Sequence, residues 1–225
     1  MATLSLNGPR LPPAAGGPAK QLVVFLHGYG ADGNDLIGLG REWARVLPHA
    51  AFVAPHAPQP CGMAPMGRQW FNLTFRDPGE MTRGVARAGP VLDAFLSAEL
   101  ERLRLPSSAL GLVGFSQGTM VALAVGLMRN PSPAAIVGYS GALADAGALV
   151  ERLGSGPAIL LVHGDMDGVI PVDAMLIARE QLARAGVPVE WHVAQGAGHG
   201  IDPTGLKLGG AFLKQAFADQ LSQGS

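Results

Sequence analysis

The sequence has little that would tie the protein to nucleic acid, to a membrane or to a metal. Its 225 residues carry a formal net charge of −1, so no basic surplus is available to neutralise a phosphate backbone. Its single cysteine, Cys61, excludes an internal disulfide and a cysteine-rich metal site. The apolar run over residues 119–128 is much shorter than the roughly 20 residues of a membrane span. We therefore predict no nucleic-acid binding, no stable membrane insertion, no metal and no cofactor.

The sequence also predicts where the protein is located and how many domains it has. The first residues show no basic segment followed by an apolar one, which is the pattern of a secretory signal, and one free cysteine suits a reducing compartment. A cytoplasmic protein is therefore expected. We expect one domain over residues 1–225, with an irregular Pro- and Gly-rich lead-in over 1–19 and a long loop over 55–83. The composition does not distinguish a monomer from a homodimer.

Short apolar runs alternate with longer helical patterns along the chain. The predicted strands cover residues 21–26, 50–54, 110–115, 134–139, 158–163 and 188–193. The predicted helices cover about 35–47, from about 90 to 103, 119–128, 145–153, 172–185 and 204–217. This alternation predicts an α/β fold with a mostly parallel central sheet and helices on both faces. Such sheets carry their chemistry in the loops beyond the carboxyl ends of the strands.

The most informative stretch is residues 110–128, where a predicted buried strand becomes an apolar helix at Ser116. In the pentapeptide G-F-S-Q-G, the serine stands between Gly114 and Gly118. A serine at such a turn is held in a strained conformation with its hydroxyl projecting, and its flanking positions must be nearly free of side chain. Because the chain has 32 glycines, the pentapeptide alone is weak, and its strand and helix carry the prediction. Ser116 is the predicted nucleophile.

A serine hydroxyl needs a base within reach and a carboxylate that holds the base in one tautomer. In a fold of this kind the order along the chain is serine, acid and histidine, each after its own strand. Asp167 is the predicted acid, and His199, which lies between glycines after the last strand, is the predicted base. Asp165 and Asp145 are the alternatives for the acid; we expect the first to hold a turn and the second to cap a helix.

The negative oxygen of a tetrahedral intermediate needs backbone N–H donors that already point at it. One predicted donor is the amide of Gln117, which opens the helix after the serine, where amides have no partner within the helix. The second is the amide of Tyr29, in the sequence H-G-Y-G that follows the first strand. Taken alone, H-G-Y-G is also compatible with a simple tight turn.

Four pieces of the sequence resemble the phospholipase/carboxylesterase family of α/β-hydrolases, which includes acyl-protein thioesterases and small bacterial carboxylesterases. They are F-L-H-G-Y-G-A-D-G over 25–33, G-F-S-Q-G over 114–118, H-G-D-M-D-G-V-I-P over 163–171 and G-H-G over 198–200. The resemblance covers about residues 22–217. It implies a single-domain α/β-hydrolase with a triad of Ser116, Asp167 and His199, an oxyanion hole at the Tyr29 and Gln117 amides, and hydrolysis of carboxylic or thioester acyl bonds. The family often has Asp where this chain has Asn72.

The substrate is expected to be a small-molecule ester with a short to medium acyl chain. The loop over 55–83 contains Met63, Met66, Trp70 and Phe71, which are predicted to line an acyl pocket, because ligand sites are mostly apolar. The alternative is that these side chains only pin the loop to the body of the protein. The cysteine in this loop is interpreted as an incidental thiol, since Ser116 occupies the elbow.

Two other functions compete with a short-chain serine carboxylesterase. The first is an acyl-protein thioesterase or lysophospholipase that acts on long acyl chains. The second is a non-catalytic α/β-hydrolase scaffold that binds a small molecule or a partner. Such scaffolds usually lack one member of the triad, and all three predicted members are present here.

Overall fold

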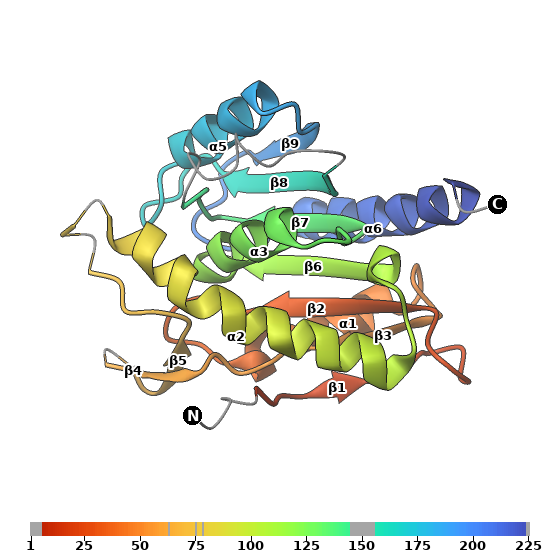
Figure 1. Ribbon diagram of the computed structural model, residues 1–225. Helices are drawn as coiled ribbons and strands as arrows, with labels where there is room; N and C mark the ends of the chain where they lie inside the picture. The colour runs from red at the N-terminus through yellow and green to blue at the C-terminus, as the bar shows by residue number, and fades with distance from the viewer. Residues whose placement is uncertain (1–5, 63, 75, 78, 145–155, 224–225) are drawn as a thin grey trace.

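The computed structural model describes residues 6–62, 64–74, 76–77, 79–144 and 156–223. Among these residues, seven strands form one sheet in the order β1-β3-β2-β6-β7-β8-β9, with β1 antiparallel and all others parallel (Figure 1). The strands are β1 (Arg10–Leu11), β2 (Gln21–Leu26), β3 (Ala50–Val53), β6 (Leu110–Phe115), β7 (Ala135–Tyr139), β8 (Ala158–Gly164) and β9 (Val189–Ala194).

Helices cover both faces of this sheet. They are α1 (Gly33–Trp43), α2 (Glu80–Leu103), α3 (Gln117–Met128), α5 (Asp173–Arg184) and α6 (Pro203–Gln223), with a short 3-10 turn at Ser107–Ala109. Alternate residues of β2 belong to different cores: Leu22 and Val24 pack with α2, α3 and α5, whereas Val23 and Phe25 pack with α1 and α6. Parallel strands read as continuous apolar runs because both of their faces are buried.

The predicted fold class is confirmed: the chain is an α/β domain with a mostly parallel sheet and helices on both faces. The first predicted strand, over 21–26, and the strand before the elbow, over 110–115, have the predicted bounds. The lead-in contains one short strand that the sequence did not reveal, β1, which pairs with β3. The helix predicted over 145–153 lies outside the described residues.

The segment over 55–83, predicted as a long loop over the site, contains regular secondary structure. It contains an antiparallel hairpin of β4 (Gln59–Cys61) and β5 (Ala64–Gln69), and α2 begins at Glu80, ten residues before Pro90. The hairpin lies beyond the carboxyl ends of the sheet strands, on the side to which the arrowheads of β6 and β8 point (Figure 1). Gly67 of β5 touches the loop after β2, since a Cβ atom built there would lie 2.0 Å from the carbonyl oxygen of Gly30.

Candidate active site

Ser116 joins β6 to α3 in a strained turn. Its backbone has φ 53° and ψ −116°, a conformation that costs a side-chain-bearing residue on the order of 1–3 kcal/mol. The surrounding structure holds it there: its N–H donates to the carbonyl of Tyr139 in the neighbouring strand over 2.9 Å. This is the geometry expected of a nucleophile elbow.

The glycines beside the serine allow this turn to pack closely. A Cβ atom at Gly118 would lie 1.9 Å from the carbonyl oxygen of Leu26, and one at Gly114 would lie 2.4 Å from the amide nitrogen of Thr119. Both distances are far inside van der Waals contact with backbone atoms, which cannot move aside easily. Gly118 is therefore required by the contact of the elbow with β2, and Gly114 is required by the close approach of β6 to the start of α3.

Asp167 lies in the loop after β8, and its carboxylate has several donors. Oδ1 accepts from the amides of Val169 and Ile170, each over 2.9 Å, and Oδ2 accepts from His199 Nδ1 over 2.8 Å. Burial by itself would raise the pKa of Asp167, but the bonds from His199 and the two amides outweigh burial and lower it. The charged form therefore stabilises the fold above the unfolded pKa near 3.9, and this stability is lost as the pH falls through the lower folded value.

His163 is a second imidazole at the same carboxylate, which sequence reasoning did not identify. It is 1% exposed at the end of β8, and its Nε2 lies 2.8 Å from the Ile170 carbonyl and 3.2 Å from Asp167 Oδ2. Since a carbonyl can only accept, Nε2 must carry a proton, and this N–H is directed at both oxygens. Its position at the start of H-G-D-M-D was the available signal, but the pattern did not show where its ring points.

His199 stands beside the elbow. Its ring centroid lies 5.0 Å from that of Phe115, the residue directly before the serine. With Nδ1 donating to Asp167, Nε2 is left as the acceptor atom of the neutral ring. The structure thus brings the predicted acid and base into contact and sets the base against the residue that precedes the predicted nucleophile.

The loops of the acid and the base are tied to each other and to β7. Asp165 Oδ1 accepts from the amide of Gly196 over 2.6 Å, so its side chain holds the two loops together, whereas we expected it to hold a turn within its own loop. Ser140, at the end of β7, donates its hydroxyl to the carbonyl of Gly200 over 3.3 Å. Asp145, the other alternative acid, lies outside the described residues.

The loop after β2 lies against the elbow and is held by β5. A Cβ atom at Gly28 would lie 3.4 Å from the Cβ of Ser116, so this loop borders the predicted nucleophile. The Gly30 amide donates to the Arg68 carbonyl over 2.9 Å, and the Arg68 amide donates to the Ala31 carbonyl over 2.8 Å. Gly30 has a φ of 81°, which glycine adopts without strain.

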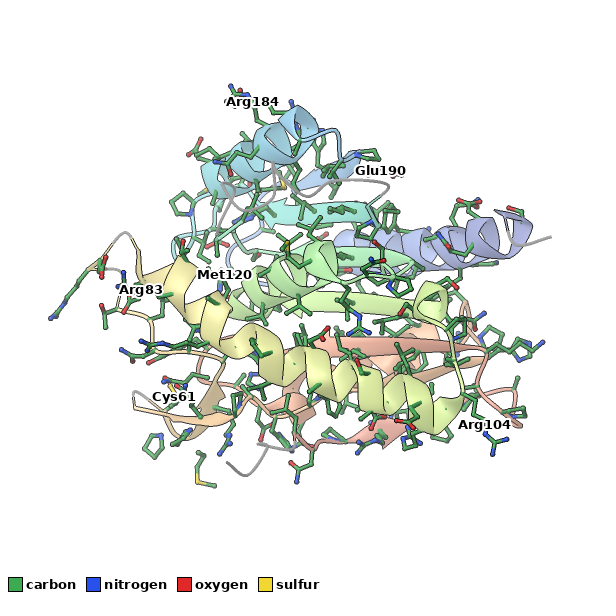
Figure 2. All side chains as sticks on the ribbon, viewed as in Figure 1. Cys61, Arg83, Arg104, Met120, Arg184 and Glu190 are labelled. Carbon is green, nitrogen blue, oxygen red and sulfur yellow. The ribbon has the colours of Figure 1, made fainter. Side chains whose placement is uncertain are left out.

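The side chain of Tyr29 is directed at the hairpin of β4 and β5. The phenol contacts the thiol of Cys61 on the hairpin, and this hydrogen bond raises the pKa of Tyr29, with burial adding to the shift. Cys61 is buried and free, and Figure 2 labels it on the hairpin. The cysteine that the sequence left without a role is therefore a packing partner of Tyr29.

Gln117 uses its side chain as a clamp, which sequence reasoning missed. The side chain is buried; Oε1 accepts from the amide of Trp70 over 2.9 Å and Nε2 donates to the carbonyl of Phe71 over 2.8 Å. The signal in the sequence was a glutamine at the start of a helix whose only other polar side chain is that of Thr119. The clamp fixes the end of the hairpin segment to the elbow.

The structure does not support the prediction that Trp70 and Phe71 line an acyl pocket. They are only 1% and 3% exposed, so they offer little surface to a ligand, and Phe71 borders a small pocket that it shares with Asn72 and Glu80. The Trp70 indole N–H donates to the His27 carbonyl over 3.0 Å, and Phe71 packs against Gly84 of α2. Met66 is 92% exposed on the hairpin, and Met63 lies outside the described residues. The burial and contacts of Trp70 and Phe71 agree with the alternative, in which these side chains attach the segment to the body of the protein.

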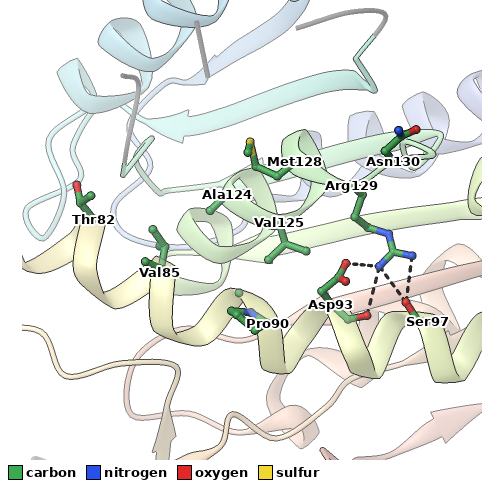
Figure 3. A pocket seen from close by; sticks show the side chains of 12 residues that line it. Thr82, Val85, Pro90, Asp93, Ser97, Ala124, Val125, Met128, Arg129 and Asn130 are labelled. Atoms are coloured by element: carbon green, nitrogen blue, oxygen red, sulfur yellow. Dashed lines mark hydrogen bonds and ion pairs between the residues drawn. The ribbon is translucent and has the colours of Figure 1, made fainter. Parts of the chain in front are cut away.

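A pocket of about 640 Å³ lies between α2 and α3 (Figure 3). Thr82 lies at one end of it and Arg129 at the other, where the guanidinium pairs with Asp93 and contacts Ser97. None of the predicted triad residues lines this pocket.

No group of three metal-ligating side chains occurs in the part of the chain that the structure describes. Within those same residues, no helix has the length and apolar character needed to cross a membrane.

The fold and the elbow define the chain as an α/β-hydrolase. A family model described as Phospholipase/Carboxylesterase matches residues 13–216. The chain therefore belongs to the phospholipase/carboxylesterase family, and it is a carboxylic ester hydrolase. The predicted family is confirmed.

Individual relatives agree with this family. The chain is 29% identical to the esterase YpfH of Escherichia coli over 85% of this chain and 81% of the relative. It is 26% identical to acyl-protein thioesterase 1 of Gibberella zeae over 86% and 89% of the two chains. The crystal structure of esterase PE8 superposes with a TM-score of 0.89 at 42% identity, over 94% of this chain and 99% of the other.

Proposed function

We propose that the chain hydrolyses carboxylic esters by a serine mechanism, with Ser116 as nucleophile, His199 as general base and Asp167 as the orienting carboxylate. The observation that carries this proposal is the 2.8 Å bond between His199 Nδ1 and Asp167 Oδ2, next to a strained serine elbow. The bond fixes the tautomer in which Nε2 is free to take a proton.

The reaction then has two halves. Ser116 Oγ attacks the ester carbonyl carbon while its proton moves to His199 Nε2, and the tetrahedral intermediate collapses as that proton passes to the departing alcohol. The acyl-enzyme is cleaved in the same way by water, which gives a proton to His199 as it attacks; the proton then returns to Ser116. The Asp167 carboxylate stabilises the imidazolium in both halves, and its lowered pKa keeps it ionised.

We propose the amides of Tyr29 and Gln117 as the donors to the negative oxygen. The proposal is supported by the position of Gln117 as the first residue of α3. It is also supported by the position of Gly28, directly before Tyr29, beside the side chain of Ser116. Within the described residues, neither amide donates to a backbone carbonyl in a turn or loop. Two such donors are each worth on the order of 10²–10³ in rate.

The proposed substrates are esters with short to medium acyl chains. This is supported by the burial of Trp70 and Phe71, which leaves these two aromatic side chains little surface with which to bind a long acyl chain. For p-nitrophenyl esters, kcat/KM is expected to be highest between acetate and octanoate and at least about tenfold lower for palmitate, whose added methylenes find no apolar site. A flat profile across chain lengths would remove this part of the proposal.

A second candidate is a thioesterase acting on long acyl chains, which is favoured by the acyl-protein thioesterases among the relatives. A palmitoyl thioester and an acetyl ester of matched leaving group separate the two candidates: a higher kcat/KM for the palmitoyl thioester would replace the short-chain ester proposal. A non-catalytic scaffold would hydrolyse neither.

We also propose a cytoplasmic location, supported by the single, buried and unpaired Cys61. Fractionation of the native host's cells tests it, and recovery of the protein mainly outside the cytoplasm would contradict it.

A further inference from the structure

His27 is a buried histidine directly after β2 that the proposed mechanism does not use. It is 0% exposed, and both of its ring nitrogens have partners. Nδ1 lies 2.8 Å from the carbonyl oxygen of Gly28, the next residue, and Nε2 lies 3.0 Å from the amide nitrogen of Ala57. A carbonyl can only accept and an amide N–H can only donate. The two contacts therefore fix the neutral ring with its proton on Nδ1.

The charge state agrees with these contacts. Burial lowers the pKa of His27, although the Gly28 carbonyl and the nearby Asp32 act in the opposite direction. A second proton on Nε2 would face the amide of Ala57 and remove the acceptor that this amide uses. The ring is thus held neutral and in one tautomer, with one donor and one acceptor directed at different segments.

The donor atom determines how the next peptide plane faces. The carbonyl of Gly28 and the N–H of Tyr29 belong to one trans peptide, in which they point in opposite directions. Drawing the Gly28 carbonyl toward the His27 ring therefore turns the Tyr29 N–H away from that ring. Gly28 itself borders the side chain of Ser116, so the orientation of this plane is set within contact distance of the nucleophile.

The neighbouring amides of the loop already have acceptors. The Gly30 amide donates to the Arg68 carbonyl over 2.9 Å, and the Ala31 amide donates to the Gly28 carbonyl over a longer 3.4 Å. The bond from His27 is therefore the shorter of the two that hold the Gly28 carbonyl. Arg68 fixes the far side of the loop, and His27 fixes the side nearest the elbow.

We infer that His27 is a positioning residue for ester hydrolysis: its Nδ1–H holds the Gly28 carbonyl so that the Tyr29 amide is aimed at the oxyanion. This inference rests on the proposed function, in which that amide is an oxyanion donor. The contact of Nε2 with the Ala57 amide has a different role, because it anchors the segment after β3.

Two variants separate the tasks of the ring. In His27→Asn, the side-chain NH₂ stands where Nδ1 stands and keeps the donor to Gly28, while the acceptor for Ala57 is lost. In His27→Gln, the longer side chain keeps an acceptor near Ala57 and loses the donor to Gly28. A structural role alone would make activity follow thermal stability in both variants.

The expected result is a crossed pattern. His27→Gln lowers kcat by about 100-fold with KM within about threefold of wild type, as for loss of one oxyanion donor. Its affinity for a trifluoromethyl ketone, whose adduct places a negative oxygen in the oxyanion site, falls in parallel. His27→Asn keeps kcat within about fivefold of wild type but melts at a lower temperature than His27→Gln, since a buried amide is left without its acceptor.

The inference is overturned if His27→Gln retains wild-type kcat, or if kcat follows melting temperature across both variants. Should neither variant fold, ¹⁵N chemical shifts of His27 in the wild-type protein decide: the Nδ1–H tautomer at neutral pH supports it, and an Nε2–H tautomer or an imidazolium refutes it. Ser116→Ala is measured in parallel. If that variant stays active, the proposed function fails; if it is inactive while His27→Gln is not, only the inference fails.

Discussion

Ser116→Ala is expected to lower kcat for p-nitrophenyl acetate by about four to six orders of magnitude, because only binding and the oxyanion donors remain. The melting temperature is expected to stay close to that of wild type. Alanine keeps the Cβ atom, so the strained φ of 53° is no worse in the variant than in the parent. Steady-state hydrolysis and a thermal melt of the same preparation check both parts.

Ser97→Ala is the matched control for this variant. Ser97 is a serine of α2 whose hydroxyl contacts Arg129 over 3.4 Å at the pocket between α2 and α3. Its removal is expected to leave kcat and KM within about twofold of wild type, as for a surface substitution. More than a few per cent of wild-type activity in Ser116→Ala would contradict the assignment of the nucleophile.

Asp167→Asn is expected to reduce kcat by about 10⁴, with the fold retained. The amide oxygen of the asparagine can keep the bonds from Val169 and Ile170, which leaves the NH₂ group facing His199. His199 Nδ1 must then accept, so its proton moves to Nε2 and the ring can no longer take the proton of Ser116. The measurement is kcat across a pH series, together with stability against denaturant.

Asp165→Asn is the control, since Asp165 lies two residues away and its oxygen accepts from Gly196. An asparagine oxygen can accept that bond too, so activity is expected within about threefold of wild type.

The free energy of unfolding gives a second test of Asp167. The advantage of wild type over Asp167→Asn should be present above about pH 4 and shrink as the pH falls, because the folded pKa of Asp167 is lowered. Equal loss of activity in both variants would show that Asp167 is not the acid.

The parts of the fold that could be predicted are those in which local pattern and tertiary position agree. The strand over 110–115 is a continuous apolar run, and it is buried on both faces. Gly114 and Gly118 marked the elbow before any contact was known, and their close approach to backbone atoms gives the reason. The order of the serine, the acid and the histidine along the chain could be predicted because each of them follows its own strand.

The hairpin of β4 and β5 could not be predicted from local signals. Its strands contain Pro60 and Pro65, which disfavour a strand in any sequence pattern. What holds it is distant in the chain: Arg68 pairs with the loop after β2, and its guanidinium donates to the carbonyls of Ala57 and Pro58, each over 2.8 Å. A two-stranded hairpin is marginal alone and depends on such contacts.

The supporting residues of the site were hidden for a related reason. His27, His163 and Gln117 are polar side chains, which are usually exposed, yet all three are buried here with their hydrogen bonds made. Most of their partners are backbone carbonyls and amides, which every residue except proline carries in full, so neither spacing nor composition reveals them. The burial of Trp70 and Phe71 was hidden for the opposite reason: the sequence pattern of apolar side chains in a long segment is the same whether they line a pocket or pack in a core.

The most direct test of the proposed mechanism is labelling with a fluorophosphonate, followed by mass-spectrometric mapping of the modified residue. It requires an activated hydroxyl, a base and oxyanion donors at one place. The predicted result is stoichiometric modification of Ser116 in the wild type and loss of rapid labelling in His199→Gln. Labelling at another residue, or labelling of Ser116 that is equally fast in His199→Gln, would contradict it.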